Sequence, residues 1–264
     1  MKLSVLNEAA RLTPIKGLGL SLSKIKLFET CAYRYYLQYF AKETFDKEDF
    51  NPKFFKIGQF AHKYIESKIK GIECKFNSET LTDVDKQQIM GRCSSVFEND
   101  YLKSILDKGQ AERGFSLYIN PNEADGLEVN EKYSKNADFA GYIDFYAKIG
   151  TTLHIIDWKT GSIKGNDDDT FMQLMLYAKA LQKLEGGSKF ILSYFYIDHA
   201  EIVTREFDAA SLDSHIDKIV KKGMDIPTQD NIKLFPANPG NACNYCPYSK
   251  IRSTDKKVVC AFAK

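Results

Sequence analysis

The sequence predicts a mixed α/β fold built around one central sheet. Segments with the 3.6-residue spacing of amphipathic helices come first, strand-like runs follow, and helices and strands then alternate. The composition is that of a folded protein, with 44% hydrophobic residues and 18 Phe and 15 Tyr against 16 Gly and 7 Pro among 264 residues. This composition excludes disordered and collagen-like chains. A chain of this size should bury about 70–75% of its unfolded surface, enough for a core without covalent staples.

The elements expected along the chain follow from apolar spacing and from turn residues. Helices are expected over 21–40, 54–70, 84–106, 170–184 and 212–223. Strands are expected over 115–119, 127–133, 190–197 and 201–207, with a hairpin of two further strands inside 138–158. Residues 1–20 read as a loop. We expect a single domain, 1–264, with a helical part over 1–110, a sheet core over 111–225 and a Cys-rich tail over 226–264.

Charge is unevenly distributed, although the net charge is only +2. Residues 1–60 carry 10 basic and 6 acidic side chains, and residues 231–264 carry 6 basic and 1 acidic, so the middle is acidic. This pattern is expected if the ends grip a polyanion while central carboxylates hold metal ions, although charge also simply fluctuates along a chain. No apolar run approaches the roughly 20 residues of a membrane span, and we expect a cytoplasmic protein.

The stretch from Asp138 to Lys159 predicts a hairpin that carries ionisable groups. Gly150-Thr151 suits a type II′ turn, in which Ile149 faces Thr152. That register places Asp144 opposite Asp157, with facing Cβ atoms about 4.5–5.5 Å apart, and Lys159 points to the same face as Asp157. Two carboxylates could together hold one divalent cation. The alternative is a structural salt bridge between Lys159 and either aspartate.

This hairpin resembles the core of the PD-(D/E)XK nucleases, in particular their RecB-like branch, which includes CRISPR-associated exonucleases with an iron–sulfur cluster. Gly141-Tyr-Ile-Asp144 is similar to the G-x-x-D strand, and Asp157-Trp-Lys159-Thr-Gly161 to the D-x-K-T-G strand. Three further motifs resemble the family in the same order, namely S-x-S…C at 21–31, G-x-x-x-H at 58–62 and Q-x-x-x-Y at 173–177. The matches span roughly residues 20–260.

The resemblance implies a restriction-endonuclease-like core, a mixed sheet flanked by helices, and a metal-dependent deoxyribonuclease in a single nuclease domain. It implies Mg²⁺ or Mn²⁺ held by His62, Asp144, Asp157 and the backbone carbonyl of Trp158, with Lys159 acting on the nucleophile. Gln173 and Tyr177 share a helix face, and Gln173 in an apolar stripe calls for a polar partner such as water or phosphate. Glu128 and Glu131 are candidates for supporting the site.

The expected activity is that of an exonuclease on single-stranded DNA or DNA ends, in recombination, repair, phage DNA metabolism or CRISPR adaptation, with protein partners in such a complex. Two alternatives remain, a structure-specific flap endonuclease and an inactive iron–sulfur DNA-binding module. The presence of His62, Asp144, Asp157, Lys159 and Gln173 together argues against the inactive module. Tyr33, Arg34 and Tyr36 are candidates for contacting a single strand, and ordinary core and surface positions explain them equally well.

Four of the six cysteines resemble a cluster site. Cys243 and Cys246 form a C-x₂-C pair, Cys260 follows after 13 intervening residues, and Cys31 lies far away near the N-terminus. In the RecB-like branch such a quartet holds a four-iron four-sulfur cluster that ties the chain ends together, although the last spacing is wider here. Four thiolates suit iron–sulfur or zinc, and a buried free thiol at Cys31 is the third alternative. Cys74 and Cys93 have no partner pattern and are expected to be small apolar fillers.

Overall fold

The computed structural model describes residues 20–43, 52–120, 122–249 and 260–262. The chain divides into two compact units. Of the described residues, those within 52–219 form the sheet unit, and 20–43, 220–249 and 260–262 form the terminal unit. The expectation of a single nuclease domain stays a prediction. Within the described residues, no helix is long and apolar enough to cross a membrane.

The sheet unit is built on a six-stranded mixed sheet in the order β2-β1-β3-β4-β5-β6. Neighbouring strands are antiparallel except for the parallel pair of β4 and β5. A parallel pair needs a crossover connection, and α6 (Asp168–Glu185) lies between these two strands in the chain. The strands are β1 (Gly109–Ile119), β2 (Leu127–Asn130), β3 (Phe139–Ile149), β4 (Thr152–Lys159), β5 (Lys189–Tyr196) and β6 (Glu201–Asp208).

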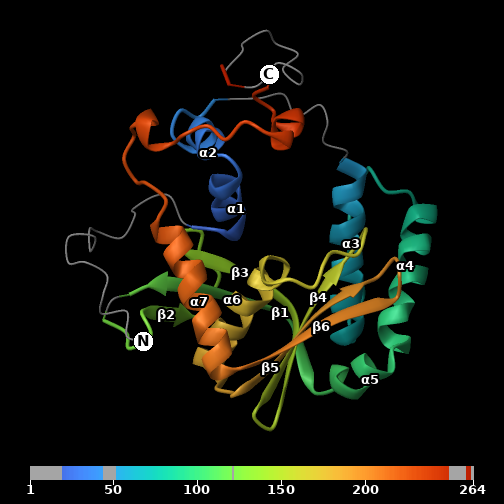
Figure 1. Cartoon of the computed structure of the whole chain (residues 1–264). Coiled ribbons are helices and arrows are strands. Elements are labelled where there is room, and N and C mark those ends of the chain that lie inside the picture. The colour runs from blue at the N-terminus through green and yellow to red at the C-terminus, as the bar shows by residue number, and fades with distance from the viewer. Residues whose placement is uncertain (1–19, 44–51, 121, 250–259, 263–264) are drawn as a thin grey trace. The chain divides into compact units, whose positions relative to one another are not determined.

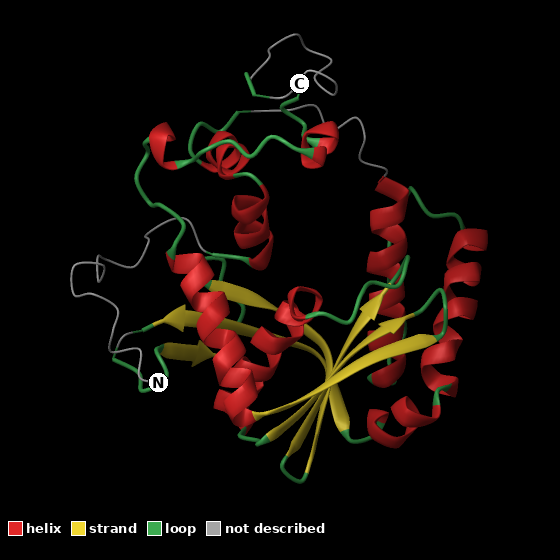
Figure 2. Cartoon of the chain, in the orientation of Figure 1, coloured by secondary structure: helices red, strands yellow, loops and turns green. Residues whose placement is uncertain are grey.

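Helices cover both faces of this sheet, as Figures 1 and 2 show. On one side lie α3 (Pro52–Ile69), α4 (Asp83–Glu98) and α5 (Asp100–Leu106), and on the other lie α6 and α7 (Ala209–Met224). One hydrophobic core packs α3, α4 and α5 against alternate residues of the sheet, among them Phe145, Ile156 and Trp158. Because side chains alternate along a strand, Asp157 and Lys159 point to the opposite face from Trp158. The predicted mixed α/β class is confirmed.

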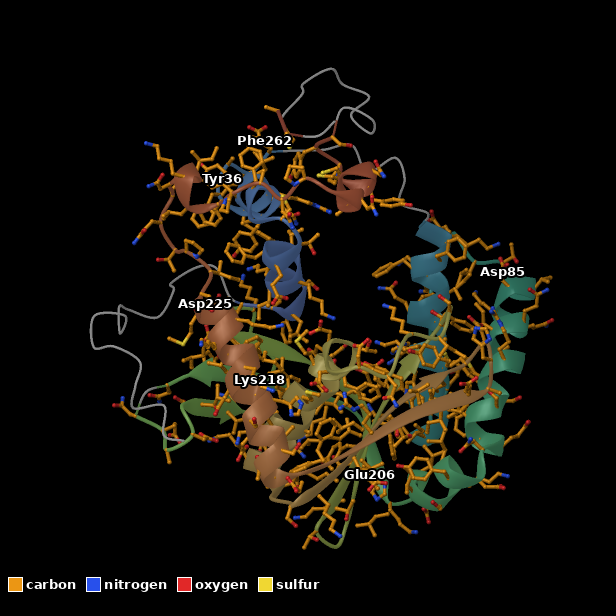
Figure 3. The ribbon with its side chains drawn as sticks, in the orientation of Figure 1. Tyr36, Asp85, Glu206, Lys218, Asp225 and Phe262 are labelled. Atoms are coloured by element: carbon orange, nitrogen blue, oxygen red, sulfur yellow. The ribbon has the colours of Figure 1, made fainter. Side chains whose placement is uncertain are left out.

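The terminal unit packs the N-terminal helices against the Cys-rich tail, as expected. Its helices are α1 (Leu22–Thr30) and α2 (Ala32–Tyr39), and the tail contains two 3₁₀ turns, η2 (Ile232–Leu234) and η3 (Asn241–Tyr245). Phe235 of the tail is 1% exposed and stacks on Tyr35 with ring centroids 6.1 Å apart. Tyr36, labelled in Figure 3, donates a hydrogen bond from its hydroxyl to Asp230 at 3.0 Å.

Two expected helices are each divided in two, so these expectations were wrong. The helix expected over 21–40 breaks at Cys31, whose backbone is extended. At this break, the C-terminal tail provides partners for backbone groups that no longer bond within a helix. The Asn238 side chain donates to the Thr30 carbonyl, and the Tyr33 N–H donates to the Pro236 carbonyl. The helix expected over 84–106 breaks at Asn99, whose side chain caps α5 by accepting from the Leu102 N–H. Asn is a favoured N-cap residue.

Candidate active site

The β3–β4 hairpin has the predicted register. Ile149 pairs with Thr152 and Phe145 pairs with Ile156. Gly150 has φ +61° and Thr151 has no positive φ, as a type II′ turn requires. Asp144 and Asp157 follow at the next position, where the paired ladder ends. The Trp158 N–H donates instead to Asp144 Oδ2 at 2.9 Å, which holds that carboxylate against the end of β4.

Both aspartates are buried. Asp144 is 8% exposed and Asp157 is 2% exposed. Lys159 Nζ forms an ion pair with Asp157 Oδ2 at 2.6 Å. Burial and the charge of Asp144 raise the pKa of Asp157, and Lys159 opposes this effect only in part. A buried carboxylate whose charge is only partly compensated is costly, and a cation would offset this cost.

His62 reaches the same carboxylates from α3. Its Nδ1 lies 3.1 Å from Asp144 Oδ1. Burial lowers the pKa of His62, but the hydrogen bond to Asp144 and the charges of Asp144 and Asp157 outweigh it, so that the pKa is raised overall. Gly58, one turn earlier, permits a close approach, because a Cβ there would lie 3.4 Å from the Thr160 hydroxyl oxygen. The G-x-x-x-H helix therefore packs against the end of the D-x-K-T-G strand.

Glu112 on β1 is a site residue that sequence reasoning missed. One ligand atom each from His62, Glu112 and Asp144 lie within 4.8 Å of one another. Burial, followed by the charges of Asp144 and Glu66, raises the pKa of Glu112 to about 6. The predicted strand began only at Phe115, and no motif marked this glutamate.

The backbone at Glu112 is also unusual. It has φ +58° and interrupts the pairing of β1 with β3, between the pairs Ala111–Phe145 and Arg113–Ile143. A left-handed conformation at a non-glycine residue costs of order 1–3 kcal/mol and is concentrated at functional sites. The local backbone of β1 is therefore strained at the residue that faces Asp144.

The two glutamates named from the sequence lie elsewhere. Glu128 on the edge strand β2 accepts a hydrogen bond from Asn120 at 3.0 Å, and Glu131 lies 3.9 Å from Arg113. Neither belongs to the group of potential ligands around Asp144. The expectation that Glu128 and Glu131 support the site was therefore wrong, and the glutamate that lies beside Asp144 is Glu112.

The Q-x-x-x-Y pair lies on α6. The Gln173 side-chain amide donates to the Tyr177 hydroxyl at 2.5 Å. Burial and the charge of Asp157 raise the pKa of Tyr177, so that its hydroxyl stays protonated beside the carboxylates. A Cβ at Gly141 would lie 3.5 Å from the Tyr177 ring, so the glycine of the G-x-x-D strand makes room for this tyrosine.

The donor set fits a divalent cation. Carboxylate oxygens with one imidazole nitrogen suit hard or borderline ions such as Mg²⁺ and Mn²⁺. The raised pKa values of Asp157 and Glu112 indicate that the protein by itself does not fully neutralise this acidic group. His62, Glu112, Asp144 and Asp157 are the residues that would hold the ion.

In the terminal unit, the four cysteines of the expected cluster line one small cavity, Cys31, Cys243, Cys246 and Cys260. All of them are free thiols. No three of the sulfur atoms belong to a group within 4.8 Å, although all four cysteines are described. Cys74 and Cys93 lie instead against the core of the sheet unit, as expected of apolar fillers.

The three residues expected to contact a single strand lie around this cavity. Tyr33 and Arg34 line it, and Tyr33 packs edge-on against Phe262, which is labelled in Figure 3. The Arg34 Nε is buried and has no hydrogen-bond partner among the described residues. Tyr36 is partly buried and packs against a hydrophobic cluster that contains Cys246 and Cys260. Their contact with nucleic acid stays a prediction.

The sheet order, its hairpin and the acidic group at the hairpin's end define a nuclease-type α/β core of the restriction-endonuclease-like class. Residues 19–251 match the sequence profile of the PD-(D/E)XK nuclease superfamily, and the chain belongs to this superfamily. By family it is a nuclease that uses divalent metal ions and acts on nucleic acid.

Other comparisons add little. A solved structure described as "Crystal structure of SSO0001" aligns with 79% of this chain and 86% of its own, with 18% identity and a TM-score of 0.30. A similarity at that score carries no argument about the site. No curated protein matches the chain.

Proposed function

We propose that this protein is a metal-dependent deoxyribonuclease of the RecB-like branch, and an exonuclease that acts on single strands or DNA ends. The observation that carries the proposal is the group of two buried aspartates, a glutamate, a histidine and a lysine at the end of one hairpin. Within the superfamily, the order of the five motifs supports the RecB-like branch. A place in recombination, repair, phage DNA metabolism or CRISPR adaptation, with protein partners there, belongs to the same proposal.

Each residue of the site has a proposed role. His62, Glu112, Asp144 and Asp157, with the Trp158 carbonyl, hold Mg²⁺ or Mn²⁺. The ion supplies Lewis acidity and offsets the charge of the scissile phosphate. Lys159, which is held beside Asp157, orients the attacking water and stabilises negative charge as it develops.

Lys159 is well placed for this role. Its ammonium lies 5.1 Å from the centroid of the Tyr194 ring, and the Tyr194 hydroxyl donates to the Thr170 carbonyl at 3.0 Å. A cation over an aromatic face is stabilised by about 0.5–2 kcal/mol. The position of Lys159 is therefore set both by Asp157 and by a tyrosine that α6 anchors. Gln173 and Tyr177 support the carboxylates from the same helix.

Digestion of end-labelled DNA tests this function directly. The full chain is incubated with Mg²⁺ or Mn²⁺ and with linear single-stranded or double-stranded DNA labelled at either end, beside Lys159→Ala. We expect the wild type to degrade single strands from an end and the variant to be at least about 100-fold slower, since one lost charge-stabilising group costs that much. Internal cuts at strand junctions would indicate a flap endonuclease instead. Binding without cleavage would contradict catalysis and indicate the inactive DNA-binding module.

Glu112 has a prediction of its own. Glu112→Gln removes one negative charge without changing volume, so we expect the metal concentration for half-maximal cleavage to rise about 10–100-fold. High Mn²⁺ should restore most of the rate, because Asp144 and Asp157 remain. The measurement is a metal titration of the cleavage rate. Glu131→Gln is the matched control, and an unchanged titration for Glu112→Gln would remove this residue from the ligand set.

We also propose a four-iron four-sulfur cluster on Cys31, Cys243, Cys246 and Cys260. All four cysteines line one small cavity, which supports one shared occupant. A zinc ion on the same four thiolates is the alternative. The unpaired Arg34 Nε at the cavity supports an anionic occupant of either kind.

A further inference from the structure

The first turn of α3 carries two exposed phenylalanines. Phe54 is 72% exposed and Phe55 is 52% exposed. The described core contacts of α3 begin only after them, with Ile57 partly buried and Phe60 fully buried. Large apolar side chains that stand together on a surface, next to a functional cavity, indicate a binding surface more often than chance exposure does.

Both phenylalanines line the cavity that opens on the candidate metal site. The cavity has a volume of about 820 Å³, and its lining includes Phe54, Phe55, His62 and Glu112. Phe54 and His62 are eight residues apart on one helix, which corresponds to about 12 Å along its axis. The aromatic pair therefore stands about two turns away from the atoms that would hold the ion.

This turn is held in place. Lys53 Nζ lies 2.9 Å from Asp85 Oδ1, which joins the first turn of α3 to the first turn of α4. Figure 3 labels Asp85 at this end of α4. Lys56 lies 6.0 Å from the centroid of the Phe55 ring and donates to Gln59 at 3.0 Å. The Phe54 ring thus projects from a helical turn whose backbone is already formed before a ligand binds.

We propose that Phe54, which stands beside Phe55, forms a stacking platform for an unpaired base of the strand whose phosphate reaches His62 and Asp144. In a duplex, neighbouring base pairs already cover the faces of each base, whereas an unpaired base has a face free to stack on an aromatic ring. Lys75 lines the same cavity and supplies positive charge for the phosphates between platform and metal, whereas Lys63 is already paired with Glu66 at 2.8 Å. The proposal rests on the nuclease function proposed above and names its substrate class.

The platform has two consequences for specificity. A phenylalanine ring has neither hydrogen-bond donor nor acceptor, so it binds any base and selects single strand over duplex without selecting sequence. At a base spacing of about 3.4 Å or more, the stacked base lies about two to four nucleotides from the phosphate at the metal site. A strand too short to reach the platform loses this binding contribution.

Tryptophan fluorescence tests the platform. The only tryptophan, Trp158, is 1% exposed, so Phe54→Trp adds a solvent-exposed reporter to a chain whose own emission comes from a buried ring. The full chain carries Asp157→Asn to prevent cleavage and is titrated in Mg²⁺ with a short oligothymidylate or a blunt duplex of the same length. We expect the single strand to quench the new emission, the duplex to leave it unchanged, and the parent with Trp158 alone to show no change.

Affinity supplies the second readout. Phe54→Ala should weaken single-strand binding about 5–100-fold. Val84→Ala changes a similarly exposed apolar residue in the first turn of α4 (63% exposed) and should leave the affinity unchanged. The platform proposal would be wrong if the single strand did not quench the new emission or if the affinity were unchanged. The nuclease function is tested independently by digestion of DNA with the wild-type protein. A cooperative loss of stability in Phe54→Ala would also overturn the platform proposal, because the ring would then be covered by the protein itself.

Discussion

Asp157→Asn is expected to reduce DNA cleavage at least about a thousandfold in a protein that remains folded. The side chain keeps its volume but no longer carries the charge that binds the cation, so both metal affinity and stabilisation of the scissile phosphate are lost. Asp157 is 2% exposed and is the carboxylate closest to Lys159. Lys159 is one-third exposed, so water can solvate its ammonium when the partner charge is removed. The measurement is the initial rate on labelled single-stranded DNA.

Thermal unfolding separates loss of chemistry from loss of structure. The wild type should gain about 2.7 kcal/mol of stability at a metal concentration 100-fold above its dissociation constant, a rise of about 5–10 °C in Tm for a unit of this size. Asp157→Asn should lose this rise and unfold without metal at the same temperature as the wild type or higher, because the repulsion between Asp157 and Asp144 is relieved. Asp83→Asn, at an exposed position in α4, should behave as wild type. Cleavage retained by Asp157→Asn would contradict the site.

Cys246→Ser is expected to abolish the iron–sulfur cluster and destabilise the terminal unit. Anaerobically purified wild type should be brown and contain iron, and the variant should be colourless. The described hydrophobic cluster around the cysteines is small, with Leu37 and Tyr248 as its other buried members. A bound metal group contributes about 10 kcal/mol or more to small domains of this kind, so its loss should leave residues 20–43 and 220–249 open to proteolysis.

Iron content per chain, the visible spectrum and limited proteolysis provide the measurements. Cys31→Ser should have the same effect as Cys246→Ser, although more than 200 residues separate these positions. Cys74→Ser is the matched control and should keep full colour, since Cys74 lies against the core of the sheet unit. Colourless wild-type protein with one zinc ion per chain would refute the iron–sulfur cluster and indicate a structural zinc site on the same cysteines. Full iron in Cys246→Ser would contradict the quartet.

Much of the site is local in the sequence and could therefore be predicted. The turn at Gly150 sets the hairpin register, and a register propagates along a ladder, so the facing of Asp144 and Asp157 followed from the turn alone. The i, i+4 spacing likewise placed Gln173 and Tyr177 on one helix face, where the partner of the Gln173 amide is the Tyr177 hydroxyl and not the water or phosphate that was expected. Such contacts depend on the geometry of a single hairpin or helix.

Glu112 could not be predicted by these rules. Its place in the site depends on the pairing of β1 with β3 and on a left-handed backbone that regular strand patterns exclude. The break at Cys31 likewise depends on hydrogen bonds from a tail about 200 residues away. Exposure of Phe54 and Phe55 was also invisible, because apolar spacing alone places them within a core-facing helix.

The sequence by itself determined the fold class, the hairpin that carries two carboxylates and a lysine, and the helix that carries His62. Each of these follows from short-range periodicity, turn chemistry or a compact motif. Only the tertiary structure decided which glutamate joins the metal group, where two helices end, and which aromatic rings remain outside the core. These features depend on contacts between segments far apart in the chain, whose free energy is not contained in any local pattern.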